Sequence, residues 1–307
     1  MFDTQAKKVL TEVAMLKEGT EANSYYFDML NVEELRSMGL TGEGFTCAVI
    51  DTGCDINHPL LKDKIIGGRN FTIEGDGEND YTDLNGHGTH VAGLIAADPC
   101  GAFKGGVAPK AKLLICKVLT KTGNGGIGAI INAIDYAIQQ KVDVINMSLG
   151  TTSNLGRLYD VVKKAYDAGI VICCASGNMA NNDKGGIDEF CYPGAYQEVI
   201  EVGAINKNKE PSYFSNSNNM IDCVCYGEEI LSTYINNRYA TLDGTSQATP
   251  LVSGCVLLLK QWFYQEFERL SSKDEIYAIL IKCSKNMKGY SKKQVGFGYI
   301  DLKELHD

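Results

Sequence analysis

Gly42-Glu-Gly-Phe-Thr-Cys-Ala-Val-Ile-Asp-Thr-Gly53 is the stretch that decides the fold of this 307-residue chain. Its centre, residues 45–50, is a short apolar run that is entered through two glycines and left through Asp51-Thr-Gly. An apolar run bounded by such turn residues is typical of a buried strand. We therefore expect Asp51 to lie at the C-terminal end of a strand.

Four further apolar runs of similar length follow along the chain, at residues 113–119, 142–147, 170–174 and 199–204. Their lengths and branched side chains are typical of parallel strands that are buried on both faces. Between them, apolar residues recur with the i, i+3, i+4, i+7 spacing of a helix face at 127–138 and at 158–165. The second of these helices is expected to end before Gly169.

The last part of the chain reads as two further helices, at residues 246–267 and 276–283, the second preceded by the capping-box residues Ser272-Lys-Asp-Glu275. Strands that alternate with helices predict an α/β fold. We expect a doubly wound, mostly parallel central sheet with helices on both faces, in three layers. Such sheets hold their functional sites at the carboxyl ends of the strands, where Asp51 is expected.

Length and composition favour one large globular domain, and they argue against nucleic-acid and membrane partners. The formal charge of −9, from 29 basic and 38 acidic side chains, disfavours nucleic acid, which is bound by clustered Lys and Arg. The N-terminus has no continuous apolar stretch of signal-peptide length, and no later run is long enough to span a bilayer. We expect a cytoplasmic protein without a membrane partner.

The eleven cysteines are an odd number in a large chain, and the adjacent pair Cys173-Cys174 cannot readily form a bridge. Free thiols in a reducing compartment fit this pattern better than a disulfide framework. Zinc binding is the alternative. However, Cys223-x-Cys225 and Cys173-Cys174 lack the C-x₂₋₄-C spacing of structural zinc sites, so no metal is assigned.

Three segments carry the residue types of nucleophilic catalysis: Asp51-Thr-Gly-Cys-Asp55, Asn85-Gly-His-Gly-Thr-His-Val-Ala-Gly93 and Asp243-Gly-Thr-Ser-Gln-Ala-Thr-Pro250. Taken singly, they read as a turn, a glycine-flanked loop and a helix N-cap. Together they supply an acid, a base and a hydroxyl at the ends of strands or the starts of helices. A serine hydroxyl becomes nucleophilic when an imidazole, held by a carboxylate, accepts its proton.

The base is chosen among four histidines. His306 lies next to the chain end, His58 precedes a proline in an expected loop, and His90 lies one helical turn after His87. His87 stands between two glycines at a helix start and is the best placed to project into a cleft. A His87/His90 metal pair is the rival interpretation, and it lacks a nearby third ligand. The sequence thus predicts Asp51, His87 and Ser246 as the catalytic residues.

The order Asp, His, Ser and its flanking residues resemble the subtilases, and most of all the intracellular subtilisins. The resemblance extends over nearly the whole chain and includes Ile65-Ile-Gly-Gly-Arg-Asn-Phe71 and Asn146-Met-Ser-Leu-Gly150. It implies a subtilisin-like fold and serine endopeptidase activity through an acyl-enzyme, without a cofactor for the chemistry. It also implies that Asn178, in Ala175-Ser-Gly-Asn178, donates a hydrogen bond to the oxyanion.

The same resemblance implies a polypeptide substrate that binds as an extended strand between two backbone edges. The edges are residues 123–126 and 148–150. Cys191 matches the floor of the primary pocket, where secreted relatives commonly have glycine, so we expect large P1 side chains to be disfavoured. Ile127 matches a more distant apolar pocket. The substrate-binding residues implied in this way are Gly125, Ile127, Ser148, Leu149, Gly150 and Cys191.

The chain also departs from the family pattern at several positions. Gln247 and Leu251 change the surroundings of Ser246 without removing its hydroxyl. Leu60 stands where many relatives have an acidic calcium ligand, and the later loop contains Cys100. Because calcium requires several hard oxygens, we expect the usual strong calcium site to be weakened or absent, while structural calcium elsewhere stays open.

The expected organisation is an N-terminal extension at residues 1–25, for which regulation is a hypothesis, followed by a peptidase domain at 26–307. General protein turnover and maturation of a peptide precursor, such as leader removal in lanthipeptide pathways, both remain open, as does a homodimer. The alternative function is that of a catalytically inactive subtilase-fold protein that binds or signals. Such proteins usually lack a triad residue, whereas all three are present here.

Overall fold

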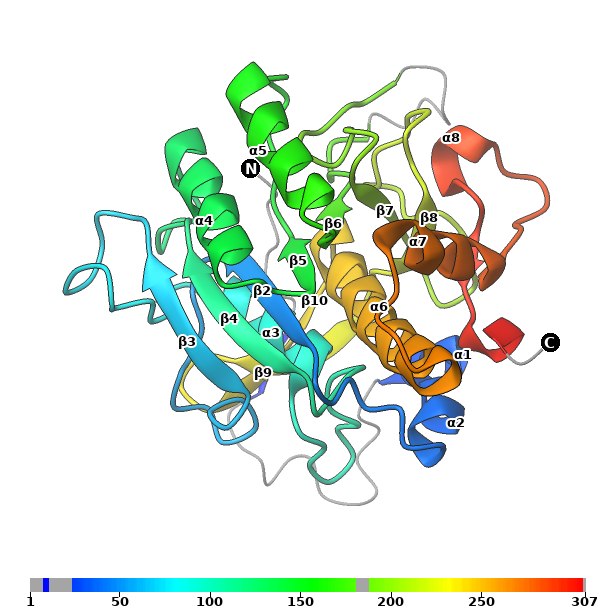
Figure 1. Cartoon of the computed structure of the whole chain (residues 1–307), viewed down its shortest axis with the longest axis horizontal. Helices are drawn as coiled ribbons and strands as arrows, with labels where there is room; N and C mark the ends of the chain where they lie inside the picture. Colours follow the sequence, from blue (N-terminus) through cyan, green and yellow to red (C-terminus); the bar gives the residue numbers. More distant parts are fainter. Residues whose placement is uncertain (1–7, 11–23, 181–187, 306–307) are drawn as a thin grey trace.

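The computed structural model describes residues 8–10, 24–180 and 188–305 of the chain, and it confirms the predicted α/β class. A nine-stranded sheet has the order β11-β12-β8-β7-β6-β5-β2-β4-β3, and its neighbours from β12 to β3 pair in parallel. Helices cover both faces, with α4 and α5 side by side on one of them (Figure 1). The strands of this sheet are β2 (Thr46–Asp51), β3 (Ile65–Asn70), β4 (Lys112–Lys117), β5 (Val144–Met147), β6 (Val171–Ala175), β7 (Ile200–Ile205), β8 (Cys223–Tyr226), β11 (Ser284–Lys285) and β12 (Tyr299–Ile300).

The helices alternate with these strands, as the sequence predicts. Those with predicted counterparts begin and end within three residues of the expected positions, and the capping box of Ser272 and Glu275 is present at the start of α7. The helices are α1 (Tyr25–Leu30), α2 (Val32–Ser37), α3 (His87–Ala96), α4 (Ile127–Gln139), α5 (Gly156–Asp167), α6 (Thr245–Phe267), α7 (Lys273–Lys282) and α8 (Lys292–Val295), followed by the 3-10 helix η2 (Leu302–Leu305).

Strand β2 lies in the middle of the sheet and contributes to two separate cores. Cys47 and Val49 pack toward α3 and α6, whereas Ala48 and Ile50 pack toward α4 and α5. The alternation follows from the two-residue period of a strand. Because both faces are buried, the strand has a continuous apolar sequence, and its last residue, Asp51, emerges at the carboxyl edge of the sheet.

Helix α6 is buried almost all round, from Thr245 to Gln261, because it lies against the sheet and is covered on its other side by further elements. It begins at a tight turn in which Gly244 has a φ of 151°, a conformation that favours glycine. This turn places the first residues of α6, among them Ser246, at the same edge of the sheet as Asp51. Figure 1 shows α6 running behind the strands toward α1 and α2.

A second, three-stranded antiparallel sheet was not predicted. It has the order β1-β10-β9 and consists of β1 (Lys8–Leu10), β9 (Ile230–Tyr234) and β10 (Arg238–Leu242). Strand β1 lies within the expected N-terminal extension, of which residues 1–7 and 11–23 are outside the described part. From α1 onward the chain packs into the core through Tyr26 and Phe27.

Candidate active site

Asp51 and His87 meet where the end of β2 faces the start of α3. The His87 Nδ1 atom lies 2.7 Å from Asp51 Oδ1, in the arrangement of an imidazole N–H that donates to a carboxylate. The same oxygen accepts a hydrogen bond of 2.7 Å from the Thr52 backbone N–H. Asp51 is fully buried and His87 nearly so. The carboxylate therefore fixes the orientation of the ring, and Nε2 is the nitrogen left for other chemistry.

Two opposing effects set the pKa of His87. Burial lowers it, because a charged imidazole loses its hydration. The negative charge of Asp51 and the hydrogen bond to it act in the opposite direction, with a further contribution from Asp83, and their combined effect raises the pKa above its ordinary value of 6.5. Asp51 therefore stabilises the imidazolium, which is the form that His87 would take after accepting a proton.

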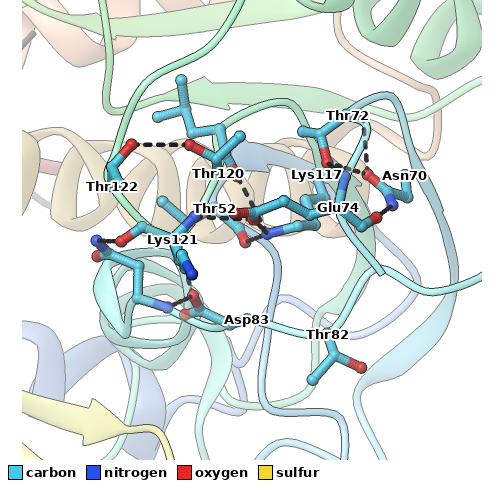
Figure 2. A network of polar contacts seen from close by, with 12 residues as sticks. Thr52, Asn70, Thr72, Glu74, Thr82, Asp83, Lys117, Thr120, Lys121 and Thr122 are labelled. Carbon is cyan, nitrogen blue, oxygen red and sulfur yellow. Dashed lines mark hydrogen bonds and ion pairs between the residues drawn. The ribbon is translucent and has the colours of Figure 1, made fainter. Parts of the chain in front are cut away.

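Asp83 connects the end of β2 to the start of α3, next to Asp51 and His87. The sequence did not predict this role. Its carboxylate lies at the start of α3 and is surrounded by donors (Figure 2). Thr52 connects it to β2, because the Thr52 hydroxyl donates to Asp83 at 2.9 Å and accepts from the Gly88 N–H at 2.8 Å. An acidic residue just before a helix start was the available signal. The other donors to Asp83 are the backbone N–H groups of Asn85, Gly86 and Thr89 and the Thr89 hydroxyl.

Ser246 occupies the second position of α6 and is fully buried. Its hydroxyl donates to the backbone oxygen of Ser148 at 3.1 Å. Among the described residues, no hydrogen bond joins Ser246 to His87 in this structure. The Ser246 hydroxyl is thus hydrogen-bonded to the segment that follows β5. A rotation about the χ1 angle of Ser246 would release the hydroxyl from this acceptor.

Asn178 follows β6 and approaches the start of α6 from the other side. Its Oδ1 atom accepts two hydrogen bonds from Thr245, 2.9 Å from the backbone N–H and 2.8 Å from the hydroxyl. Because both bonds engage the oxygen, the amide Nδ2 is left as a donor on the opposite side of the group. Thr245 precedes Ser246, so the Asn178 amide is anchored beside the serine.

A cavity of about 770 Å³ lies beside His87. Its walls include residues 123–125 and 148–150 of the two expected backbone edges, together with Thr151 and Met179. Asn178 and the buried Ser246 and Asp51 are not part of this wall. Of the six residues implied to bind substrate, five line this cavity: Gly125, Ile127, Ser148, Leu149 and Gly150. Cys191 does not line it and is 1% exposed. Its neighbour Tyr192 pairs with Thr151 through two backbone hydrogen bonds.

Comparisons with known proteins agree with this geometry. The model of the subtilase family matches residues 42–298. The chain belongs to the subtilase family. It is 50% identical over 267 residues to an intracellular serine protease of Paenibacillus polymyxa. The aligned residues are 87% of this chain and 81% of that protein. It is 47% identical over 276 residues to the major intracellular serine protease of Bacillus subtilis, covering 89% and 86% of the two chains.

Other relatives are less similar. Subtilisin DY of Bacillus licheniformis is 39% identical over 235 residues, which are 76% of this chain and 83% of that protein. Membership of the family, together with the protease relatives, makes this subtilase a serine endopeptidase. In the described part of the chain, no helix combines the length and apolar character needed to cross a membrane.

The other described histidines of this subtilase are engaged elsewhere. His90 is fully buried, and its Nε2 lies 3.0 Å from Ile230 O and 3.1 Å from Ala240 O in the small sheet. Burial, with the nearby His87 as a second cause, lowers the pKa of His90 to about 3. His58 Nε2 faces Arg238 O at 3.3 Å. His90 thus links α3 to β9 and β10. His306 lies outside the described residues.

The loop at residues 98–103, for which we expect a weakened calcium site, begins with an ion-paired carboxylate. Leu60 packs against the core, and Asp98 Oδ1 accepts a hydrogen bond of 2.6 Å from Lys64 Nζ. An ammonium therefore already neutralises the carboxylate at this place. Within residues 8–10, 24–180 and 188–305, no cluster of three or more His, Cys, Asp or Glu has the arrangement of a metal site. All eleven cysteines are free thiols, and ten of them are buried.

Proposed function

We propose that this subtilase hydrolyses peptide bonds with Ser246 as nucleophile, His87 as general base and Asp51 as the group that orients and stabilises His87. The observation that carries the proposal is the buried hydrogen bond of 2.7 Å between Asp51 and His87, of which His87 lies on the wall of the cavity. A carboxylate in this position fixes the tautomer in which Nε2 lacks a proton and can accept one. No observation favours the inactive binding or signalling alternative.

The first step requires the Ser246 hydroxyl to leave the Ser148 carbonyl oxygen, its acceptor in the substrate-free structure. Ser148 belongs to the expected substrate edge, so the P1 backbone N–H of a substrate is a competing donor for the same oxygen. The released hydroxyl then transfers its proton to His87 Nε2 while Oγ attacks the carbonyl carbon. Substrate binding thereby frees the nucleophile.

Collapse of the tetrahedral intermediate completes acylation. The electron pair on the oxyanion re-forms the carbonyl, the C–N bond breaks, and His87 gives its proton to the departing amine. The Asn178 Nδ2 donor and the Ser246 backbone N–H stabilise the oxyanion, and loss of one such donor costs about 10²–10³ in kcat in subtilisin. Water then attacks the ester, with the same proton transfers through His87, and releases the acid and Ser246.

The substrate is a polypeptide bound in extended form between the edges at 123–126 and 148–150. Both edges line the cavity that contains His87. Main-chain hydrogen bonds accept many sequences, so preference depends on the side-chain pockets. Ile127, on the cavity wall, suits an apolar side chain at a distance from the reacting bond. We infer from the family resemblance that Cys191, which is buried and outside the cavity wall, limits the P1 pocket.

We place this activity in the cytoplasm, acting on proteins in general turnover or on one peptide precursor. The names of the relatives from Paenibacillus polymyxa and Bacillus subtilis, both intracellular serine proteases, support this location. Eleven unbridged thiols fit a reducing compartment. Mass spectrometry of the products from a proteome-derived peptide mixture separates the two roles, because a single narrow cleavage motif indicates precursor processing.

Active-site labelling tests the assignment of the nucleophile. A fluorophosphonate probe should modify the wild-type chain at Ser246, and Ser246→Ala should abolish both labelling and peptide hydrolysis. His87→Ala should lose hydrolysis and nearly all labelling while keeping the far-UV circular dichroism of the wild type. Labelling that persists in Ser246→Ala contradicts the assignment, and a chain that is neither labelled nor active supports the binding alternative.

A further inference from the structure

Lys117, the last residue of β4, has its amino group buried next to the catalytic strand. The side chain is 1% exposed, and Nζ donates to Thr52 O at 2.7 Å and to Leu119 O at 3.1 Å. Thr52 directly follows Asp51 and donates its N–H to the Asp51 carboxylate. A buried cation requires partners, and two carbonyl groups leave its charge without a counter-ion.

Glu74 supplies the counter-ion. Its Oε2 atom lies 3.4 Å from Lys117 Nζ, and the Glu74 side chain is 17% exposed (Figure 2). The residue belongs to the loop between β3 and α3, where hydrogen bonds with Asn70 and Thr72 fix its backbone. Glu74 is therefore a carboxylate that a separate loop inserts against the end of β4.

The same Glu74 oxygen accepts a second hydrogen bond, from the backbone N–H of Lys121 at 2.8 Å. Lys121 lies in a turn that is closed by Thr120 and Asn124, and this turn continues into the substrate edge at 123–126. Thr122, Gly123 and their neighbours line the catalytic cavity. One carboxylate thus holds both the cation behind Asp51 and the turn that begins the substrate edge.

The turn is connected to the catalytic histidine as well. The Lys121 carbonyl accepts a hydrogen bond of 2.9 Å from the Asn85 side chain, and the Asn85 Oδ1 atom accepts one of 3.1 Å from the His87 N–H. Lys121 therefore lies between Glu74 on its N–H side and Asn85 on its carbonyl side. These contacts connect the turn to the Thr52 carbonyl through Glu74 and Lys117, and to the His87 N–H through Asn85.

We propose that Glu74 is a positioning residue, which couples occupation of the 123–126 edge by an extended peptide to the alignment of Asp51 and His87. The inference rests on the proposed function. A peptide that adds a strand to this edge orders the turn containing Lys121 and tightens its link to Glu74. Binding of substrate residues remote from the cleaved bond then improves the geometry of the reacting groups, which raises kcat rather than affinity alone.

Two fluorogenic peptides with the same P2 and P1 residues test this coupling, one ending at P2 and the other extended to P5. In the wild-type enzyme, kcat should be higher for the extended peptide. In Glu74→Ala the ratio of the two kcat values should fall at least tenfold, with KM for the short peptide unchanged. Glu74→Gln keeps an acceptor for Lys121 and loses the charge, so its ratio should fall less.

Glu78→Ala is the matched control. Glu78 lies in the same loop and pairs with Arg69 at 2.8 Å, but its side chain is 61% exposed. Its ratio should equal that of the wild type. An unchanged ratio in both Glu74 variants overturns the inference, as does an equal loss of kcat for both peptides, the result expected of a merely structural role. Fluorophosphonate labelling of the wild type reports separately on the proposed function.

Discussion

The hydroxyl of Ser148 donates a hydrogen bond of 2.9 Å to the backbone oxygen of Ser246. In a regular helix, this oxygen accepts from the N–H of the residue four positions on. That residue is Pro250, which has no N–H. Ser148 therefore replaces the missing helix donor, and the main chain of Ser246, the proposed nucleophile, is attached to the segment expected to bind P1.

Ser148→Ala should leave the Ser246 carbonyl buried without its donor. A buried polar group left unpaired costs about 1–3 kcal/mol, so the free energy of unfolding should fall by about that amount. Denaturant unfolding in a Ser246→Ala background, which prevents autolysis, measures the loss. The matched variant is Pro250→Ala, which restores a helix donor at position 250. Ser148→Ala should lower the free energy of unfolding less when Pro250→Ala is also present. An equal loss with and without Pro250→Ala contradicts the explanation.

Replacing Asp51 by Asn should change both the rate and its pH dependence. Protonated His87 cannot accept a proton, so activity falls as the pH drops through the pKa of His87, which the Asp51 charge holds above 6.5. Without that charge, burial dominates and the pKa falls. The acid limb of kcat/KM should move to lower pH, while kcat drops about 10⁴-fold, the size of the effect of the same substitution in a chymotrypsin-type triad. An acid limb at the wild-type pH contradicts the assignment.

The central sheet could be predicted from the sequence because strands buried on both faces have continuous apolar sequences. Strand β2 and its neighbours β4 to β7 begin and end within two residues of the predicted runs, and α4 and α5 bury the predicted faces. Strand β3 has no such run, since it lies at the sheet edge and contains two glycines. The hairpin β9–β10 alternates apolar and polar residues too irregularly to be recognised.

The proposed catalytic side chains could be predicted because each stands in a local motif, whereas the residues that contact and support them could not. Glu74, Asp83 and Lys117 read as ordinary loop and strand-end residues. Their roles depend on partners up to 65 positions away, such as Lys117 with Thr52 and Glu74 with Lys121. Only the topology, which places the ends of β2 and β4 together, determines that a buried cation lies behind the catalytic acid.

Glu201 is a buried carboxyl group in β7 with no cation against it among the described residues. One oxygen accepts from Asn218 at 3.2 Å and the other has no hydrogen-bond partner. Burial raises the pKa of Glu201 well above its ordinary value, and the charge of Asp222 adds to this although the Asn218 bond opposes it. The folded state therefore keeps a proton that the unfolded chain releases once the pH exceeds about 4.3.

Stability should thus decrease as the pH rises above the unfolded pKa, until the folded pKa is passed. Glu201→Gln removes this titration and preserves an acceptor for Asn218. We expect the Tm of Glu201→Gln to be higher than that of the parent at pH 8 and equal to it at pH 4. In a chain of this size, each kcal/mol of added stability raises the Tm by about 2 °C. Scanning calorimetry in the Ser246→Ala background measures both. Equal Tm values at pH 8 would show that the charge of Glu201 is compensated.

Calcium should contribute little at residues 98–103, because Lys64 already pairs with Asp98 there. Calorimetric titration of metal-stripped protein should detect no binding of micromolar or tighter affinity that is sensitive to Asp98→Asn. Lys64→Ala should lower the free energy of unfolding by about 1 kcal/mol or less, since Asp98 is partly exposed. Tight calcium binding that Asp98→Asn abolishes contradicts this prediction.

Cys191 should set the size limit of the P1 pocket. Its thiol is buried, and the next residue, Tyr192, forms two backbone hydrogen bonds with Thr151, which follows the edge at 148–150. Cys191→Gly removes a methylene and a sulfur atom at this place. One methylene in an apolar pocket changes specificity by about 10–200-fold, so kcat/KM for P1 Phe relative to P1 Ala should rise at least tenfold.

The comparison requires peptides that differ only at P1. Cys100→Ala is the control, because Cys100 is more exposed than the other cysteines and lies in the loop at 98–103, where it pairs with Phe103. Its ratio should match that of the wild type. If Cys191→Gly leaves the ratio unchanged, the limit lies elsewhere on the cavity wall. A wild-type preference for Phe or Trp at P1 would itself exclude Cys191 as a restricting floor.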